Sequence, residues 1–316
     1  MKKFLRKIGP YVFYGFLVVF LFFYLRKIDY AQLTHLEFSG WFVAYAVISG
    51  LVARNWGVFI WLNILRDLGA QNLTDKVQLN YAYAKSWLGR YIPGTAPWIL
   101  GKIYFASRHG ISKNKLAVSS VMEGGLQILV TMVVSSTLLI FDRRLDVIDV
   151  RIKIAMAIVI ILGVVAATPP VFNRLMAIIY RVVRKKTFPV EHQASSRAMI
   201  KAALLYVIGV AFYGTSLFFT AKAIYPGLAY NDAFFIIGGA SLASAAGMLV
   251  IFAPSGIGVR ESIQLVMFSL IMPREVALVV VVFSRLMSVL LDFAFFGIAW
   301  SLLHGRQNRK KSAEAT

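Results

Sequence analysis

The chain has 316 residues and a formal net charge of +20, with 59% apolar and only 15% charged residues. Soluble domains are about half apolar and about a quarter charged, so this composition excludes an ordinary soluble protein or a disordered chain and indicates a membrane protein. The basic excess then fits anionic lipid head groups rather than nucleic acid, and the absence of cysteine excludes disulfides, thiol catalysis and cysteine-ligated metals.

Apolar stretches long enough to cross a membrane recur along the chain, since a spanning helix needs about 20 mostly apolar residues. We expect six full spans, at residues 8–25, 41–65, 116–141, 154–172, 202–221 and 276–303. The first is followed by Arg26 rather than by a small-residue cleavage site, so we interpret it as a retained helix and not as a signal peptide. The basic connection 172–201 is interpreted as a loop that sets orientation, the alternative being an amphipathic surface helix over residues 174–184.

Two stretches carry helix-breaking residues within apolar sequence. Residues 79–107 contain Tyr-Ile-Pro-Gly-Thr-Ala-Pro-Trp (91–98), and residues 233–272 contain Ala-Pro-Ser-Gly-Ile-Gly-Val-Arg-Glu-Ser (253–262). Proline and glycine break helices, and broken backbone at membrane depth survives only when it is buried in protein or lines a wet cavity. We therefore expect two re-entrant helical hairpins, with residues 93–97 and 253–259 non-helical; the alternative for the second is that its first arm, 233–251, crosses fully.

The distribution of basic residues favours a cytoplasmic location for both termini. In that topology 23 of the 34 Lys and Arg residues lie in cytoplasmic segments, 8 lie outside and 3 lie at membrane depth. The hairpins then enter from opposite faces, a pattern typical of inverted-repeat transporters, whose binding sites lie near the midplane. The prediction is one all-α domain over residues 1–316, a polytopic bundle in the inner cell membrane, in which the opposed hairpins suggest an inverted repeat.

The second hairpin carries residues suited to binding an anion. Gly256 and Gly258 permit a tight turn, after which a helix is expected to restart near Val259 with unpaired amides in its first turn. Arg260 adds a planar donor suited to phosphate, and Glu261 is expected to pair with a basic residue or to accept a bond from a substrate amine. The alternative is a structural corner that these two charges seal.

The first hairpin follows the same pattern. Pro93 and Gly94 break the helix, Arg90 precedes the break, and Lys102 and Arg108 follow it. We interpret these cations as a basic mouth for a lipid phosphate, with cytoplasmic anchors as an equal alternative.

Ionisable residues within the predicted spans need partners, because a charge at a helix centre costs at least ~2.5–3.5 kcal/mol. Arg285 and Asp292 stand seven residues apart, too far for a direct pair, so each is expected to meet another helix. Glu123 is expected to meet Arg54, Arg260 or Arg285. These residues form either interhelical contacts or a polar path through the bundle.

The candidate substrate-binding set collects these residues: Arg54, Arg90, Pro93, Gly94, Lys102, Glu123, Pro254, Gly256, Gly258, Arg260, Glu261, Arg285 and Asp292. We expect no catalytic residues, cofactor or metal, because the four histidines are scattered and no catalytic motif is present. The tryptophans and tyrosines are interpreted as interfacial anchors.

Three motifs together resemble a known family: Gly-Arg-Tyr-Ile-Pro-Gly (89–94), Arg-His-Gly-Ile-Ser (108–112) and Pro-Ser-Gly-Ile-Gly-Val-Arg-Glu (254–261). They resemble the lysylphosphatidylglycerol synthase transmembrane-region family, also called flippase-like integral membrane proteins, from the second span to the end of the chain. The resemblance implies a polytopic bacterial or archaeal membrane protein whose best-understood relatives flip an aminoacylated phospholipid made by a cytosolic transferase domain. Only 13 residues follow Leu303, so we expect this chain to lack that domain and not to make the lipid.

Residues and resemblance together favour non-enzymatic translocation of a phosphate-bearing lipid or lipid-linked sugar, with Arg260 meeting the phosphate. The alternatives are a secondary transporter of a small anion and an accessory membrane subunit of envelope lipid or polysaccharide modification. The expected partners are membrane lipids with anionic or phosphate-bearing head groups, with a second copy of the chain or an envelope enzyme as further candidates and no nucleic acid.

Overall fold

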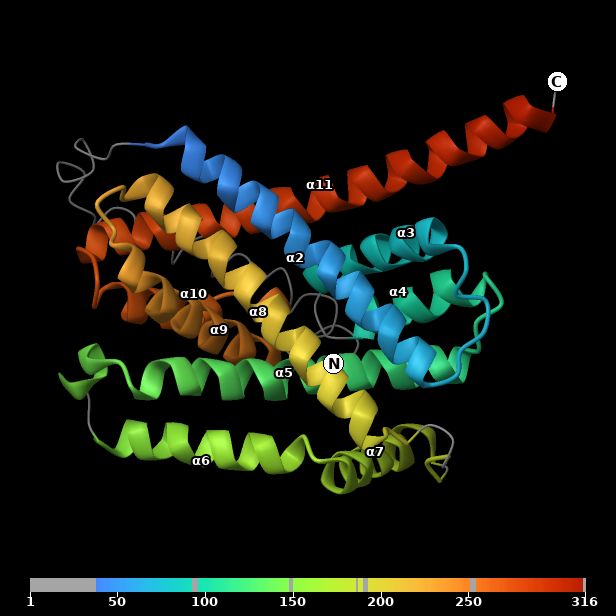
Figure 1. The fold of residues 1–316 in the computed structure, drawn as a ribbon, viewed down its shortest axis with the longest axis horizontal. Helices are drawn as coiled ribbons and strands as arrows, with labels where there is room; N and C mark the ends of the chain where they lie inside the picture. Colours follow the sequence, from blue (N-terminus) through green and yellow to red (C-terminus); the bar gives the residue numbers. More distant parts are fainter. Residues whose placement is uncertain are drawn as a thin grey trace, which may run out of the picture.

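The computed structural model describes residues 38–92, 96–147, 150–185, 187–189, 193–250 and 254–314, and within these ranges it is all-helical (Figure 1). The predicted all-α membrane bundle is therefore confirmed, while the predicted first span, 8–25, lies outside the described residues. The helices are α2 (Gly40–Asp67), α3 (Lys76–Trp87), α4 (Ala96–Ser107), α5 (Lys113–Ile140), α6 (Val150–Ala166), α7 (Pro169–Arg184), α8 (Ser196–Ile224), α9 (Ala233–Leu249), α10 (Val259–Phe268) and α11 (Arg274–Glu314).

Four predicted spans correspond to long apolar helices: α2, α5, α8 and α11. The segment Tyr230–Leu249, which contains α9, is also long and apolar enough to cross a membrane, so the described residues hold five such helices by length and composition. A sixth is counted if α6 and α7 form one bent span.

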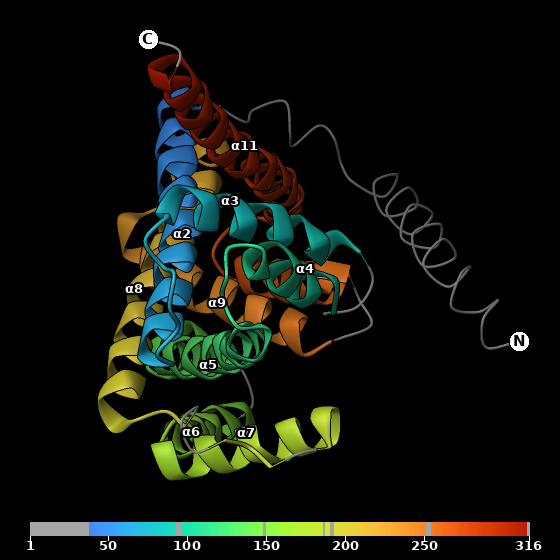
Figure 2. The ribbon, with the colours of Figure 1, turned by 90° about the vertical axis from the view of Figure 1, so that its right-hand side faces the viewer.

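The predicted span 154–172 is wrong at its C-terminal end. α6 ends at Ala166, and α7 begins at Pro169 after a bend of 82°. Two consecutive prolines lack the backbone N–H groups that would continue α6, but they fit the first turn of a new helix. Residues 174–184 are therefore helical, as the alternative interpretation expected, while the described residues between α7 and α8 form a loop. Figure 2 shows α7 running across the end of α6.

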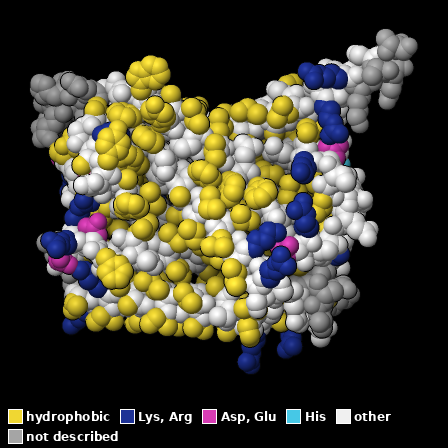
Figure 3. Space-filling view, viewed as in Figure 1, with side chains coloured by type: hydrophobic (Ala, Val, Ile, Leu, Met, Phe, Trp, Pro, Cys, Tyr) yellow, Lys and Arg dark blue, Asp and Glu magenta, His cyan; other side chains and the backbone are white. Residues whose placement is uncertain are grey.

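Apolar side chains cover the outside of the bundle. Along α2, Trp41, Tyr45, Ile48 and Phe59 are exposed on one helix face, as expected of side chains that meet lipid tails rather than water. Figure 3 shows hydrophobic side chains over the middle of this face of the molecule, with lysine and arginine gathered toward its two ends. This distribution agrees with spans that run from one end of the molecule to the other.

Two helical hairpins enter the bundle from opposite ends (Figure 1). α3 and α4 pack together as the first, and α9 and α10 as the second. Their tips are the short 3-10 helices Leu88–Tyr91 and Pro254–Gly256, which contact each other inside the bundle. The Arg90 Nε donates a hydrogen bond of 3.1 Å to the Ser255 hydroxyl across this contact.

The hairpin tips are shorter than predicted. Ala96 and Pro97 belong to α4, although they were expected to be non-helical, because proline is accepted in a first helical turn. Residues 93–95 and 253 lie outside the described ranges. The expected helix restart at Val259 is confirmed.

Gly256 and Gly258 meet backbone requirements at the second tip. Both have positive φ values, +68° and +89°, which L-residues with a side chain rarely adopt. A Cβ on Gly256 would also lie 2.7 Å from the Cα of Gly247, so glycine lets the tip approach α9 closely.

Each hairpin is fixed by its own apolar cluster. The first packs Leu79 and Tyr83 against Trp61 of α2 and Phe295 of α11. The second packs α9 and α10 against α8 and the start of α11, through side chains such as Phe235 and Phe268. Because each cluster fixes its hairpin in the bundle, the two tips meet there, and polar groups such as Arg90 and Ser255 lie beside each other.

Candidate functional site

A cavity of about 440 Å³ lies between the hairpin tips and helices α2, α5 and α8. Its volume is within the usual range of ligand pockets, about 300–1,000 Å³. The described lining residues include three arginines, Arg54, Arg90 and Arg260, but one acidic residue, Glu123. The cavity therefore combines apolar walls with an excess of cationic groups.

Asp292 of α11 is fully buried and connects three parts of the bundle. It accepts hydrogen bonds from the Arg54 Nε at 2.7 Å and from the Tyr91 hydroxyl at 2.6 Å. The Trp87 indole donates to the same carboxylate at 3.2 Å, and an Arg90 nitrogen lies 3.7 Å from it. This carboxylate thus holds the tip of the first hairpin against α2 and α11, and the expected interhelical partner of Asp292 is present.

The three lining arginines differ in how many of their N–H groups already donate hydrogen bonds to the protein. Arg54 also donates to the backbone oxygens of Gly50 and Ser288, so its guanidinium is occupied by the protein. Arg90 lies over the Trp87 ring, 4.6 Å from its centroid, and reaches both tips. Arg260 is the least engaged.

Arg260 is buried and lines the cavity. It donates a hydrogen bond to the Tyr213 hydroxyl of α8, and no described carboxylate lies within ion-pair distance of it. The alternative in which Arg260 seals the corner with Glu261 is therefore not what the geometry shows.

Glu261 instead caps the N-terminus of α10. Its carboxylate accepts the Gly258 backbone N–H at 2.7 Å and lies 3.6 Å from Arg285 of α11. The expected basic partner of Glu261 is therefore Arg285, but the expected anion site on these amides is partly filled by the chain's own carboxylate. Arg260 remains as the cation of this tip that faces the cavity.

The expected partner of Glu123 is wrong. Its carboxylate accepts hydrogen bonds from the Lys102 ammonium and from the Tyr83 hydroxyl, and none of Arg54, Arg260 or Arg285 pairs with it. The ammonium lies 4.2 Å from the ring centroids of both Tyr83 and Trp98 and has no exposed surface. A salt bridge inside an aromatic cage thus joins α4 to α5.

The predicted basic mouth is also corrected. Arg90 sits at the hairpin tip, Lys102 is buried against Glu123, and Arg108 is exposed beside Tyr104. They face different surroundings because Arg90 belongs to the 3-10 helix Leu88–Tyr91, Lys102 lies on the buried face of α4, and Arg108 follows the end of α4 at the surface. They do not converge on one phosphate.

Most predicted site residues lie around or next to the cavity. Arg54, Arg90, Glu123, Gly256 and Arg260 line it, Lys102 and Asp292 contact its lining residues, and Gly258, Glu261 and Arg285 lie behind the second tip. Pro254 begins the second tip, and Pro93 and Gly94 lie outside the described residues.

Four tyrosines interpreted as interfacial anchors lie inside the bundle instead: Tyr83, Tyr91, Tyr206 and Tyr213. Each hydroxyl hydrogen-bonds a residue of the polar interior. For two of them the sequence holds a signal that could have indicated this: Tyr206 and Tyr213 stand seven residues apart, on one face of a predicted span.

The polar groups at the cavity carry a net positive charge. Arg54, Arg90, Lys102 and Arg260 supply four cations, and Glu123 and Asp292 supply two carboxylates, which leaves two positive charges uncompensated. No group of three or more metal-ligating side chains is present among the described residues. The site is therefore suited electrostatically to an anion.

The family model for the lysylphosphatidylglycerol synthase transmembrane region matches residues 9–295. The chain belongs to this family. It is accordingly a multi-pass membrane protein, and the family indicates a function related to membrane lipids. No curated protein and no solved structure matched the chain.

Proposed function

We propose that this family member moves a phosphate-bearing lipid head group between the two leaflets of the cell membrane. The observation that carries the proposal is Arg260, a buried cation that lines the cavity beside Tyr213 and has no carboxylate partner among the described residues. An unpaired charge at membrane depth is costly and marks a functional position by default. A phosphate oxygen would supply the missing anion, and guanidinium is a good donor for it.

The hairpins supply the route in this proposal. Binding sites between opposed hairpins allow a transporter to open toward one side at a time. The hydrogen bond from Arg90 to Ser255 links the two tips, so passage of a head group requires this contact to open. The lipid tails would stay in the hydrocarbon beside the apolar outer face of the bundle.

The direct test is leaflet redistribution in proteoliposomes that contain the purified protein. We expect phosphatidylglycerol with a fluorescent acyl chain to exchange between leaflets, measured as the fraction that dithionite bleaches from outside. A labelled glycosyl diacylglycerol, which has no phosphate, serves as the control lipid and should exchange much more slowly. If no phospholipid exchanges while the liposomes take up free phosphate, the alternative of a small-anion transporter replaces this proposal.

We further propose that the connections 68–75, 108–112 and 185–195 face the cytoplasm, because predicted cytoplasmic cations lie in them or beside them, Arg66 and Lys76 flanking the first. Gln71 and Ala229 are exposed at opposite ends of the bundle, and the chain contains no cysteine. In whole cells, an impermeant maleimide should label Ala229→Cys but not Gln71→Cys. The reverse pattern would invert the orientation.

A further inference from the structure

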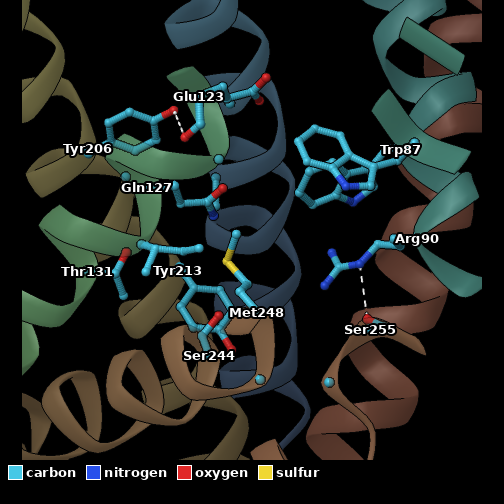
Figure 4. Close-up of a pocket in the computed structure, with 18 of the residues that line it drawn as sticks. Trp87, Arg90, Glu123, Gln127, Thr131, Tyr206, Tyr213, Ser244, Met248 and Ser255 are labelled. Atoms are coloured by element: carbon cyan, nitrogen blue, oxygen red, sulfur yellow. Dashed lines mark hydrogen bonds between the residues drawn. The ribbon is translucent and has the colours of Figure 1, made fainter. Parts of the chain in front are cut away.

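One wall of the cavity is polar without being charged. Gln127 and Thr131 come from α5, and Ser241 and Ser244 come from α9. In each pair the residues are one helical turn apart, so both helices turn a polar face toward the cavity. Figure 4 shows Gln127, Thr131, Tyr213 and Ser244 on one side, with Trp87 and Arg90 on the other.

Two polar atoms, one of them on a residue of this wall, are buried without a hydrogen-bond partner among the described residues. Ser241 is among the residues that line the cavity, and its hydroxyl is fully buried and has no hydrogen-bond partner among the described residues. The Gln264 Nε2, one turn after Arg260 on α10 and outside the cavity lining, likewise has no partner in the described part of the chain. Buried polar groups are almost always paired, so an unpartnered hydroxyl on a residue of the cavity wall points to a partner that a ligand could supply.

Among the described lining residues, no free carboxylate is left to pair with a cationic head group. Glu123 begins the α5 polar face, but its two oxygens already accept from Tyr83 and Lys102. A substrate ammonium placed beyond it would meet Arg260 rather than a free carboxylate. Neutral hydroxyl groups, by contrast, can donate to and accept from serine, threonine and glutamine side chains.

We propose that this wall, formed by Gln127, Thr131, Ser241 and Ser244, is a subsite for a hydroxyl-bearing head group attached to the phosphate, such as glycerol or a sugar. The inference rests on the proposed function, in which Arg260 holds the phosphate at the edge of the same wall. It specifies the substrate class as a polyhydroxy phosphodiester lipid.

Two lipids of equal charge test this subsite. Short-chain phosphatidylglycerol and short-chain phosphatidylmethanol are both monoanionic phosphodiesters, but only the first carries head-group hydroxyls. Titration of the protein in detergent, read out as thermal stabilisation, gives an apparent Kd for each. We expect phosphatidylglycerol to bind roughly 2–10-fold more tightly for each hydroxyl that gains a protein hydrogen bond.

The variant Ser241→Ala removes the unpartnered hydroxyl at minimal change of volume. We expect it to reduce the ratio of the two affinities roughly 2–10-fold, with a Tm equal to or above that of the wild type, because no protein hydrogen bond is lost. Ser284→Ala is the matched control, since Ser284 is a buried serine whose hydroxyl bonds the Val281 backbone oxygen away from the cavity lining. It should leave the ratio unchanged.

Equal affinity for the two lipids in the wild type, or binding of neither, would overturn the subsite. An unchanged ratio in Ser241→Ala would overturn the role of this hydroxyl. Selective binding of phosphatidylglycerol without exchange between leaflets would contradict the proposed function and leave the subsite in place. Exchange of both lipids at equal rates, with equal affinities, would support the proposed function and overturn the subsite.

Discussion

Replacing Arg260 with alanine should reduce lipid exchange roughly 10–150-fold while the protein stays folded, the range expected when a charge-assisted hydrogen bond is lost. Arg260 lines the cavity, and its described polar partner is the Tyr213 hydroxyl. Its removal leaves no buried carboxylate behind, because Glu261 is held by Arg285 and by the Gly258 amide. Leaflet exchange in proteoliposomes should therefore fall, while the Tm in detergent should stay near the wild-type value.

Conservative and double variants separate the phosphate role from a structural one. Arg260→Lys keeps the charge but loses the planar fork, so exchange should fall only in part. If Arg260 served to balance Glu261, Arg260→Ala would lower the Tm, and adding Glu261→Ala would restore both Tm and exchange. That recovery would exclude the phosphate site.

The long apolar runs predicted most of the bundle, because a helix in a bilayer is specified by length and composition alone. α2, α8 and α11 contain three of the predicted spans and extend beyond them at both ends, and α5 covers a fourth except for its last residue, Phe141. The proline pair at 169–170 marked the end of α6, but the sharp bend into α7 depends on Phe172 and Met176 packing into the core, which an apolar count does not reveal.

The partners of the charged residues were predictable only in part. Spacing showed that Arg285 and Asp292 need other helices, and both have partners there. The sequence did not reveal that Lys102 meets Glu123, because a lysine near a cytoplasmic loop has the same local pattern whether it faces lipid head groups or the core. Which face of α4 is buried is decided by its packing on α3 and α5.

The polar wall was missed for a similar reason. Serine and threonine within apolar helices commonly bond their own backbone, as Ser284 and Thr220 do here, so their presence in a span carries little information. Ser241 became informative only when its burial, its position on the cavity and its missing partner were known together.

We expect the Lys102–Glu123 salt bridge to contribute to the stability of the fold rather than to lipid transport. Both side chains are almost completely buried, so Lys102→Met leaves a carboxylate without its cation and should lower the free energy of unfolding by about 3–5 kcal/mol. The Tyr83 hydroxyl continues to donate to Glu123 but does not neutralise it. Equilibrium unfolding in detergent measures the loss.

The double variant Lys102→Met with Glu123→Gln shows whether the pair serves stability or lipid transport. Glutamine still offers an oxygen to the Tyr83 hydroxyl, and methionine fills the space between the Tyr83 and Trp98 rings without a charge. Because removing both charges of a buried pair is often close to neutral, stability should return to near the wild-type value. Lipid exchange should return with it, since Arg260 and the polar wall are untouched. A stable double variant that moves no lipid would instead place these two charges on the substrate path.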